Sequence, residues 1–274
     1  MKKIQVVVAL VMILLSLTVQ LAAQNNATEQ MVVALSNPGK SYTLHIGLTY
    51  GSIKVTGTTG KDIVIDVTSN EKNRTASTED AGNGMKRIFP AAGYEITATE
   101  NNNTVNISNS HNRNVSLVLK VPQDGKLKLS TVNSGVIEVE NVKGEIEVNN
   151  VNGAIKLTNI SGSAVATTVN GNVTATFTAI TDNAPMAFST LNGNVDVSLP
   201  AAAKANPKLR SDRGEIYTDF DMAVDKSTLK VTKDTEPGMQ RLKMDDWITG
   251  KINGGGAEIL MKNMNGNLYL RKMK

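Results

Sequence analysis

Four glutamates within a ten-residue stretch form the densest carboxylate group of the 274-residue chain: Glu138, Glu140, Glu145 and Glu147. Two carboxylates about 5–9 Å apart can act as acid and as nucleophile or base in glycoside hydrolysis, so this cluster is the candidate active site of a carbohydrate-active enzyme. However, Glu138 and Glu140 lie two residues apart, which places both on one solvated face of a strand. The run between Tyr94 and Phe177 also has no aromatic residue that could hold a sugar ring. We therefore expect no catalytic residue and keep the enzyme as an alternative.

Two other short motifs match ligand-binding patterns only loosely. Residues 34–41 (ALSNPGKS) have the layout of a phosphate-binding loop, but that site needs a following helix, and residues 42–46 (YTLHI) alternate as a strand does. Residues 254–258 (GGGAE) share a double glycine with calcium-binding nonapeptide repeats but lack the aspartate that each such repeat needs. The chain has no cysteine and only two histidines, His45 and His111. We expect no bound nucleotide, metal or cofactor.

The first 24 residues have the layout of a secretory signal peptide. Lys2 and Lys3 precede an almost wholly apolar run over residues 4–19, and small residues then lead to a possible cleavage point at Ala23. The run is shorter than the ~20 residues that span a bilayer, which favours cleavage over a retained anchor. No later segment is apolar enough to span. We expect export to the periplasm, the outer-membrane surface or the extracellular space.

Charge excludes one class of partner. The whole chain has 29 basic and 25 acidic residues, and removing the two lysines of the signal leaves 27 against 25. Proteins that bind nucleic acid carry a marked positive excess, because they neutralise phosphates. A nearly neutral mature chain gives no reason to expect nucleic acid as a partner.

The elements that would position any binding residue come from a nine-residue repeat. Its glycines are nine residues apart: Gly135, Gly144, Gly153, Gly162 and Gly171. Apolar residues stand two and four positions after each glycine, with another residue between them, which is typical of a short half-buried strand. Asn-Gly pairs mark every second unit and recur at Gly193, while a weaker match ends at Gly214. The structural unit is therefore a coil of about 18–22 residues with two strands and two corners.

These patterns predict an all-β fold: a single-domain parallel β-solenoid over residues 25–274. An antiparallel β-meander is the alternative, because Asn-Gly between strands also favours hairpins. The constant period favours parallel stacking, in which like residues lie over like residues, and Asn141, Asn150 and Asn159 would form a stacked amide ladder. The sharpest repeats cover 123–220. The irregular segments 25–120 and 232–274 are predicted to cap the two ends.

A known family shares two features of the middle of the chain. An apolar strand ends in Val121-Pro122, and Thr-Val-Asn-Gly strands follow at residues 131–135 (with an extra Ser134), 168–171 and, as TLNG, 190–193. With these features, residues 115–173 resemble the bacterial putative-adhesin family of exported β-helical proteins. The resemblance is sharp over 115–220. It implies an envelope-facing solenoid with no assigned catalytic residues.

The expected function is therefore non-catalytic binding or scaffolding at the cell envelope, with an unknown glycan or protein as partner. The alternatives are a carbohydrate-active enzyme on a β-helix and a structural or sensing envelope component with a protein partner. Four residues of the tail could contact an anionic surface: Tyr269, Arg271, Lys272 and Lys274. A frayed, charged terminus is the preferred interpretation of that tail.

Overall fold

The structure is a computed structural model that describes residues 28–69, 94–110, 113–133, 135–225, 231–236, 239–244 and 247–273. The candidate signal peptide (1–24) lies outside these residues. Every regular element in the described part is a β-strand, so the all-β prediction is confirmed. No helix in that part is long and apolar enough to cross a membrane.

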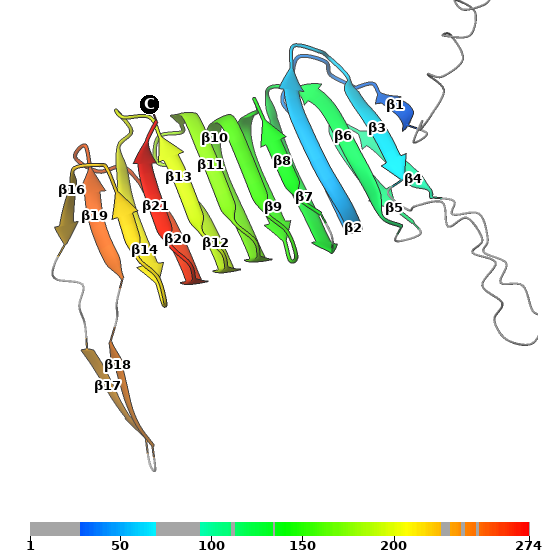
Figure 1. The fold of residues 1–274 in the computed structure, drawn as a ribbon. Coiled ribbons are helices and arrows are strands. Elements are labelled where there is room, and N and C mark those ends of the chain that lie inside the picture. The colour runs from blue at the N-terminus through cyan, green and yellow to red at the C-terminus, as the bar shows by residue number, and fades with distance from the viewer. Residues whose placement is uncertain are drawn as a thin grey trace, which may run out of the picture.

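The strands stack into two long faces joined by tight corners (Figure 1). In order of pairing, face A contains β1 (Thr28–Val33), β3 (Ile63–Ser69), β6 (Val115–Pro122), the second half of β2 (Tyr42–Thr58), β8 (Ile137–Glu140), the first half of β10 (Ile155–Asn170), β11 (Val173–Ile180), β13 (Val195–Leu199), β21 (Leu268–Lys272) and β15 (Ile216–Thr218).

Face B contains β4 (Ile96–Asn101), β5 (Thr104–Asn109), the first half of β2, β7 (Gly125–Asn133), β9 (Lys143–Asn150), the second half of β10, β12 (Met186–Asn192), β20 (Ala257–Asn265), β14 (Ala205–Ser211), β19 (Ile248–Ile252) and β16 (Met222–Asp225). A separate antiparallel hairpin consists of β17 (Val231–Glu236) and β18 (Met239–Met244).

Pairing is parallel through the middle of both faces and antiparallel only at the ends. At one end β1 pairs with β3 and β4 with β5, and at the other β14, β19 and β16 pair in turn. The meander alternative is therefore wrong for the repeat region, where every pairing between neighbouring coils is parallel.

The core lies between the two faces and consists of stacked aliphatic layers. Along face A, Ile137 pairs with Ile155, Ile155 with Val173, and Val173 with Val195, and all four are buried. Because successive side chains of a strand point to opposite sides, every second residue points into the core. Each fully buried aliphatic side chain contributes about 1.5–3 kcal/mol to the stability of the fold. Phe177 and Phe188 fill the core edge-to-face, with their centroids 6.0 Å apart.

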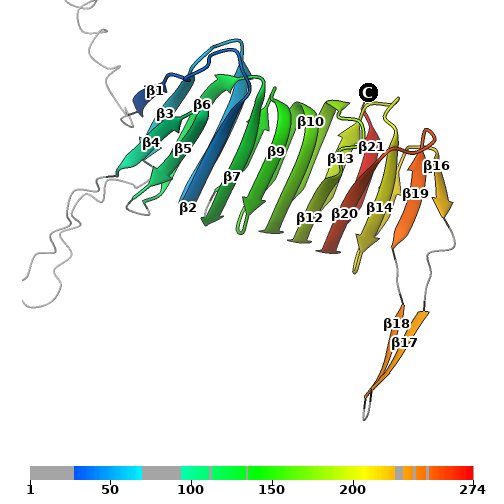
Figure 2. The same cartoon turned by 180° about the vertical axis from the view of Figure 1, so that it is seen from behind.

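Stacking order differs from chain order in the positions of β2, β20 and β21. Strand β2 lies between β6 and β8 on face A, and between β5 and β7 on face B. Strands β20 and β21 lie between β12–β13 and β14–β15, which both views show as red strands among yellow ones (Figures 1 and 2). Segments 25–120 and 232–274 thus contribute internal coils as well as end strands. Every coil presents similar backbone hydrogen-bonding groups to its neighbours, so the repeat does not specify the order in which the coils stack.

The glycines of the repeat line two opposite corners. A Cβ on Gly153 would collide with the carbonyl oxygen of Gly135, and one on Gly162 with that of Gly144. The column at the first corner runs, in stacking order, through Gly51, Gly135, Gly153, Gly171, Gly193, Gly266 and Gly214. Consecutive nine-residue units alternate between the corners, so two units make one coil. Only glycine permits backbones to approach this closely.

Candidate functional site

The first corner is held together by side chains from inside the coils. From Gly51 to Gly266, each glycine carbonyl of the column accepts a hydrogen bond of 2.8–3.0 Å from a threonine, asparagine or serine of a neighbouring coil. The donors are Thr131, Asn150, Thr168, Thr190, Asn263 and Ser211. These bonds satisfy carbonyl groups that would otherwise be left without partners at the corner. Their role is structural.

The amide ladder does not pass through the asparagines that the sequence suggested. Asn150 is buried and binds the Gly135 carbonyl, whereas Asn141 and Asn159 occupy the opposite corner with φ of 57° and 52°. The reason is the half-coil spacing: nine residues separate Asn150 from each of the other two. The observed ladder joins Nδ2 to Oδ1 at 2.7–3.0 Å through Asn133, Asn152, Asn170, Asn192 and Asn265.

The glutamate cluster is split between the two faces. Glu138 and Glu140 lie on β8 of face A, and the corner after them carries Glu145 and Glu147 onto β9 of face B. Three of the four form exposed ion pairs with lysines of neighbouring strands: Glu138 with Lys54 (3.6 Å), Glu145 with Lys126 (3.0 Å) and Glu147 with Lys128 (3.3 Å). The four carboxylates therefore do not converge on one reaction centre.

The other two ligand-like motifs are turns followed by strands. The Lys40 amide donates to the Asn37 carbonyl at 3.2 Å, and β2 begins at Tyr42, so no helix follows the candidate phosphate loop. Gly254 and Gly255, with φ of 87° and 91°, form the turn between β19 and β20. Neither turn has the geometry that its motif requires.

Two tyrosines meet on the outer surface of face A at its last two strands. Tyr269 of β21 is in register with Tyr217 of β15, although 52 residues separate them in the chain. Their ring centroids are 5.2 Å apart and their planes differ by 8°, so the rings stack. The Tyr217 side chain is 45 % exposed. We call the surrounding group the tyrosine site; its members are Asp196, Glu215, Tyr217, Asp219, Asn267, Tyr269 and Arg271.

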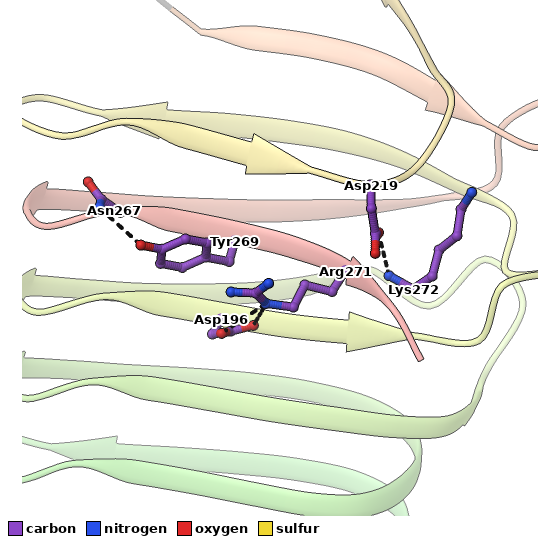
Figure 3. A network of polar contacts seen from close by, with 6 residues as sticks. All are labelled: Asp196, Asp219, Asn267, Tyr269, Arg271 and Lys272. Carbon is purple, nitrogen blue, oxygen red and sulfur yellow. Dashed lines mark hydrogen bonds and ion pairs between the residues drawn. The ribbon is translucent and has the colours of Figure 1, made fainter. Parts of the chain in front are cut away.

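An arginine covers part of the tyrosine stack. The Arg271 guanidinium carbon lies 4.6 Å from the centre of the Tyr269 ring, and Arg271 Nε donates to both carboxylate oxygens of Asp196 at 3.0 and 3.1 Å (Figure 3). The hydrogen bond that Arg271 donates to Asp196 raises the pKa of Arg271. This is a cation–π contact whose cation is held by a carboxylate one strand away.

Hydrogen bonds fix the remaining members of the site. Asn267 Nδ2 donates to the Tyr269 hydroxyl at 3.1 Å, and the Lys272 amide donates to Asp219 at 2.6 Å (Figure 3). The Tyr217 hydroxyl donates to the Glu215 carboxylate, and this bond raises the pKa of Tyr217. Tyr217 is therefore a neutral phenol at physiological pH, with an anionic acceptor beside it.

Sequence reasoning did not predict this site, although a signal for it exists. Tyr217 and Tyr269 each stand three residues after a corner glycine, Gly214 and Gly266, in the position that Glu138 occupies after Gly135. The interpretation of a frayed tail is wrong for Tyr269, Arg271 and Lys272, which belong to β21 between β13 and β15. Lys274 lies outside the described residues.

One family model and two solved structures are similar to this chain. Residues 131–270 match the family model described as Toastrack DUF4097. A putative cell adhesion protein from Clostridium sporogenes superposes with a TM-score of 0.42 and 11 % identity, covering 90 % of this chain and 100 % of that one. A putative adhesin from Bacteroides fragilis superposes with a TM-score of 0.37 and 10 % identity, covering 91 % and 98 % respectively. No curated protein matches the sequence.

Proposed function

Because the chain belongs to the Toastrack DUF4097 family, we propose that it is an exported, non-catalytic β-solenoid that binds a component of the cell envelope, as an adhesin or a scaffold does. The observation that carries this proposal is the tyrosine site. It places an exposed aromatic ring and several charged groups on a flat strand surface, where a large ligand can reach them.

The surface over β8 and β9 and their neighbours is arranged differently from the tyrosine site. Over the middle coils, lysines and glutamates of neighbouring strands neutralise one another in exposed pairs, which contribute about 0–1 kcal/mol each. Such pairs leave little unbalanced charge for a partner. An exposed aromatic ring flanked by polar groups is the more common kind of anchor in binding surfaces.

Export supports an envelope partner rather than a cytoplasmic one. Residues 1–24 have a basic start, an apolar middle and small residues near Ala23, which is the pattern of a cleaved signal. We propose that the mature chain acts in the periplasm, on the outer-membrane surface or outside the cell.

Binding and turnover measured on the same ligands test this function. The mature chain (25–274) is applied to a panel of envelope glycans and envelope proteins, and each glycan is also assayed for cleavage. We expect binding without cleavage. Cleavage that is lost in the Glu145→Gln or Glu147→Gln variant would instead identify a carbohydrate-active enzyme and would refute the proposal.

A further inference from the structure

We infer that the outer edge of β15 binds an extended, positively charged segment of a partner protein, and that an arginine or lysine of this segment stacks on Tyr217. This inference rests on the proposed binding function and specifies its partner. Three features of the last strand carry it: an open edge, the direction of an exposed ring and the charges beside that ring.

The edge of β15 is unpaired in the part of the chain that the structure describes. β15 pairs with β21 on one side only, whereas the equivalent strand of face B, β14, is covered by β19 and then β16. Face A therefore ends in backbone groups that face outward. Such an edge accepts an additional strand, because main-chain N–H and C=O groups are aligned for pairing.

The Tyr217 ring faces this edge. Aromatic carbons approach one another to about 3.5 Å, so two rings with centroids 5.2 Å apart and planes 8° apart cannot lie side by side in one plane. Each ring must turn a face toward its neighbour on the next strand. One face of Tyr217 contacts Tyr269, and the other points away from the stack, toward the position that a further strand would occupy.

Carboxylates flank the exposed ring. Glu215 and Asp219 stand two residues before and after Tyr217, both are exposed, and residues at that spacing share one side of a strand. The two cations of β21 have other partners: Arg271 is held by Asp196, and the Lys272 ammonium lies over the Phe220 ring at 5.6 Å. Asp219 turns toward β21, where it accepts from the Lys272 amide, so Glu215 is the acid that lies beside the exposed ring. An exposed aromatic ring with a carboxylate beside it favours a cationic ligand.

The preceding strand already contains this type of contact. There the Arg271 guanidinium lies 4.6 Å from the centre of the Tyr269 ring and is held by the Asp196 carboxylate. A partner arginine on Tyr217, held by Glu215, would repeat the same arrangement at the end of the stack.

The open edge favours a protein over a sugar as the source of the cation. A strand that adds to β15 gains main-chain hydrogen bonds along Ile216–Thr218 and at the same time places every second side chain on the outer surface of face A. A neutral sugar would use the ring but would use neither the strand edge nor the carboxylate charge.

Short peptides of alternating Thr and Val with one central variable residue test the inference on the mature chain by titration calorimetry. The central residue is Arg, Lys or Gln. We expect the Arg and Lys peptides to bind at least tenfold more tightly than the Gln peptide, and added salt to weaken them. An Arg peptide N-methylated at alternate positions, which cannot pair as a strand, should lose binding. Two glycan probes, glucosamine oligomers and N-acetylglucosamine oligomers, are titrated in parallel.

Variants locate the site. Tyr217→Ala and the milder Glu215→Gln should each weaken the Arg peptide at least fivefold, while Tyr50→Ala, which removes another tyrosine of similar exposure (40 %), should not. Circular dichroism confirms that each variant retains its strand content. Equal binding of Arg and Gln peptides, full binding of the N-methylated peptide, or tighter Tyr217-dependent binding of either glycan would overturn the inference. If the wild-type chain binds no envelope glycan and no envelope protein, the proposed function itself is refuted.

Discussion

The corner glycines allow a stability prediction whose parts can be separated. Gly162 has a φ of 121°, and a Cβ added to it would collide with the carbonyl oxygen of Gly144 in the neighbouring coil. An L-residue in such a backbone conformation costs about 1–2 kcal/mol. Forcing extra volume into a packed position costs about 1–3 kcal/mol more. We therefore expect Gly162→Ala to lower the free energy of unfolding by about 2–5 kcal/mol.

Gly39 supplies the matched control. Its φ is also positive, at 83°, but nothing lies within 4 Å of a Cβ added there. Gly39→Ala should therefore show only the conformational cost of about 1–2 kcal/mol. Urea unfolding followed by circular dichroism compares the two variants under one set of conditions. Equal losses in both variants would show that the coils separate at no cost to admit a methyl group, and would refute the argument that close backbone stacking requires glycine.

Three further measurements test other contacts. Asn152→Ala removes two hydrogen bonds of the amide ladder, whereas Asn133→Ala removes one. Urea unfolding should therefore show a loss of about 1–2 kcal/mol of stability for Asn152→Ala and about 0.5–1 kcal/mol for Asn133→Ala. Equal losses would contradict the ladder. Burial raises the pKa of Tyr42, so the unfolded chain releases this proton near pH ~10 while the folded chain retains it. Stability should then fall as pH rises above ~10, and Tyr42→Phe should reduce the fall in alkaline unfolding. The Glu215→Gln variant should lower the raised pKa of Tyr217 toward its ordinary value in a spectrophotometric titration; an unchanged titration would exclude the Glu215 hydrogen bond as its cause.

Local features of the fold follow from residue spacing. The alternation around each repeat glycine places Ile137 and Ile155 in the core, and the nine-residue period places successive glycines at opposite corners. Both are properties of one coil and its nearest neighbour, which a short stretch of sequence contains. The same period shows why the ladder through Asn150 was wrong, since a residue half a coil away cannot stack on Asn141 or Asn159.

The tyrosine site could not be predicted in the same way. Tyr217 and Tyr269 are 52 residues apart, and they meet because β21 is inserted between β13 and β15. The position of β21 depends on how well the side chains of different coils pack against one another. The backbone groups of the coils are similar and do not determine it. The site therefore depends on the order in which the coils stack. If the coils stacked in chain order, the two tyrosines would lie on coils that are not adjacent.

The inserted strands also bear on how the chain reaches its native order. β14 and β15 precede β20 and β21 in the chain, so an arrangement in which they dock directly on β12 and β13 competes with the native one. In that competing arrangement Tyr217 would face Asp196, and the tyrosine pair would not form. In the native arrangement Tyr217 meets Tyr269, and Arg271 takes Asp196. These outer contacts favour the native stacking order over the competing one. The surface that we propose for a partner therefore also stabilises the native order of the coils.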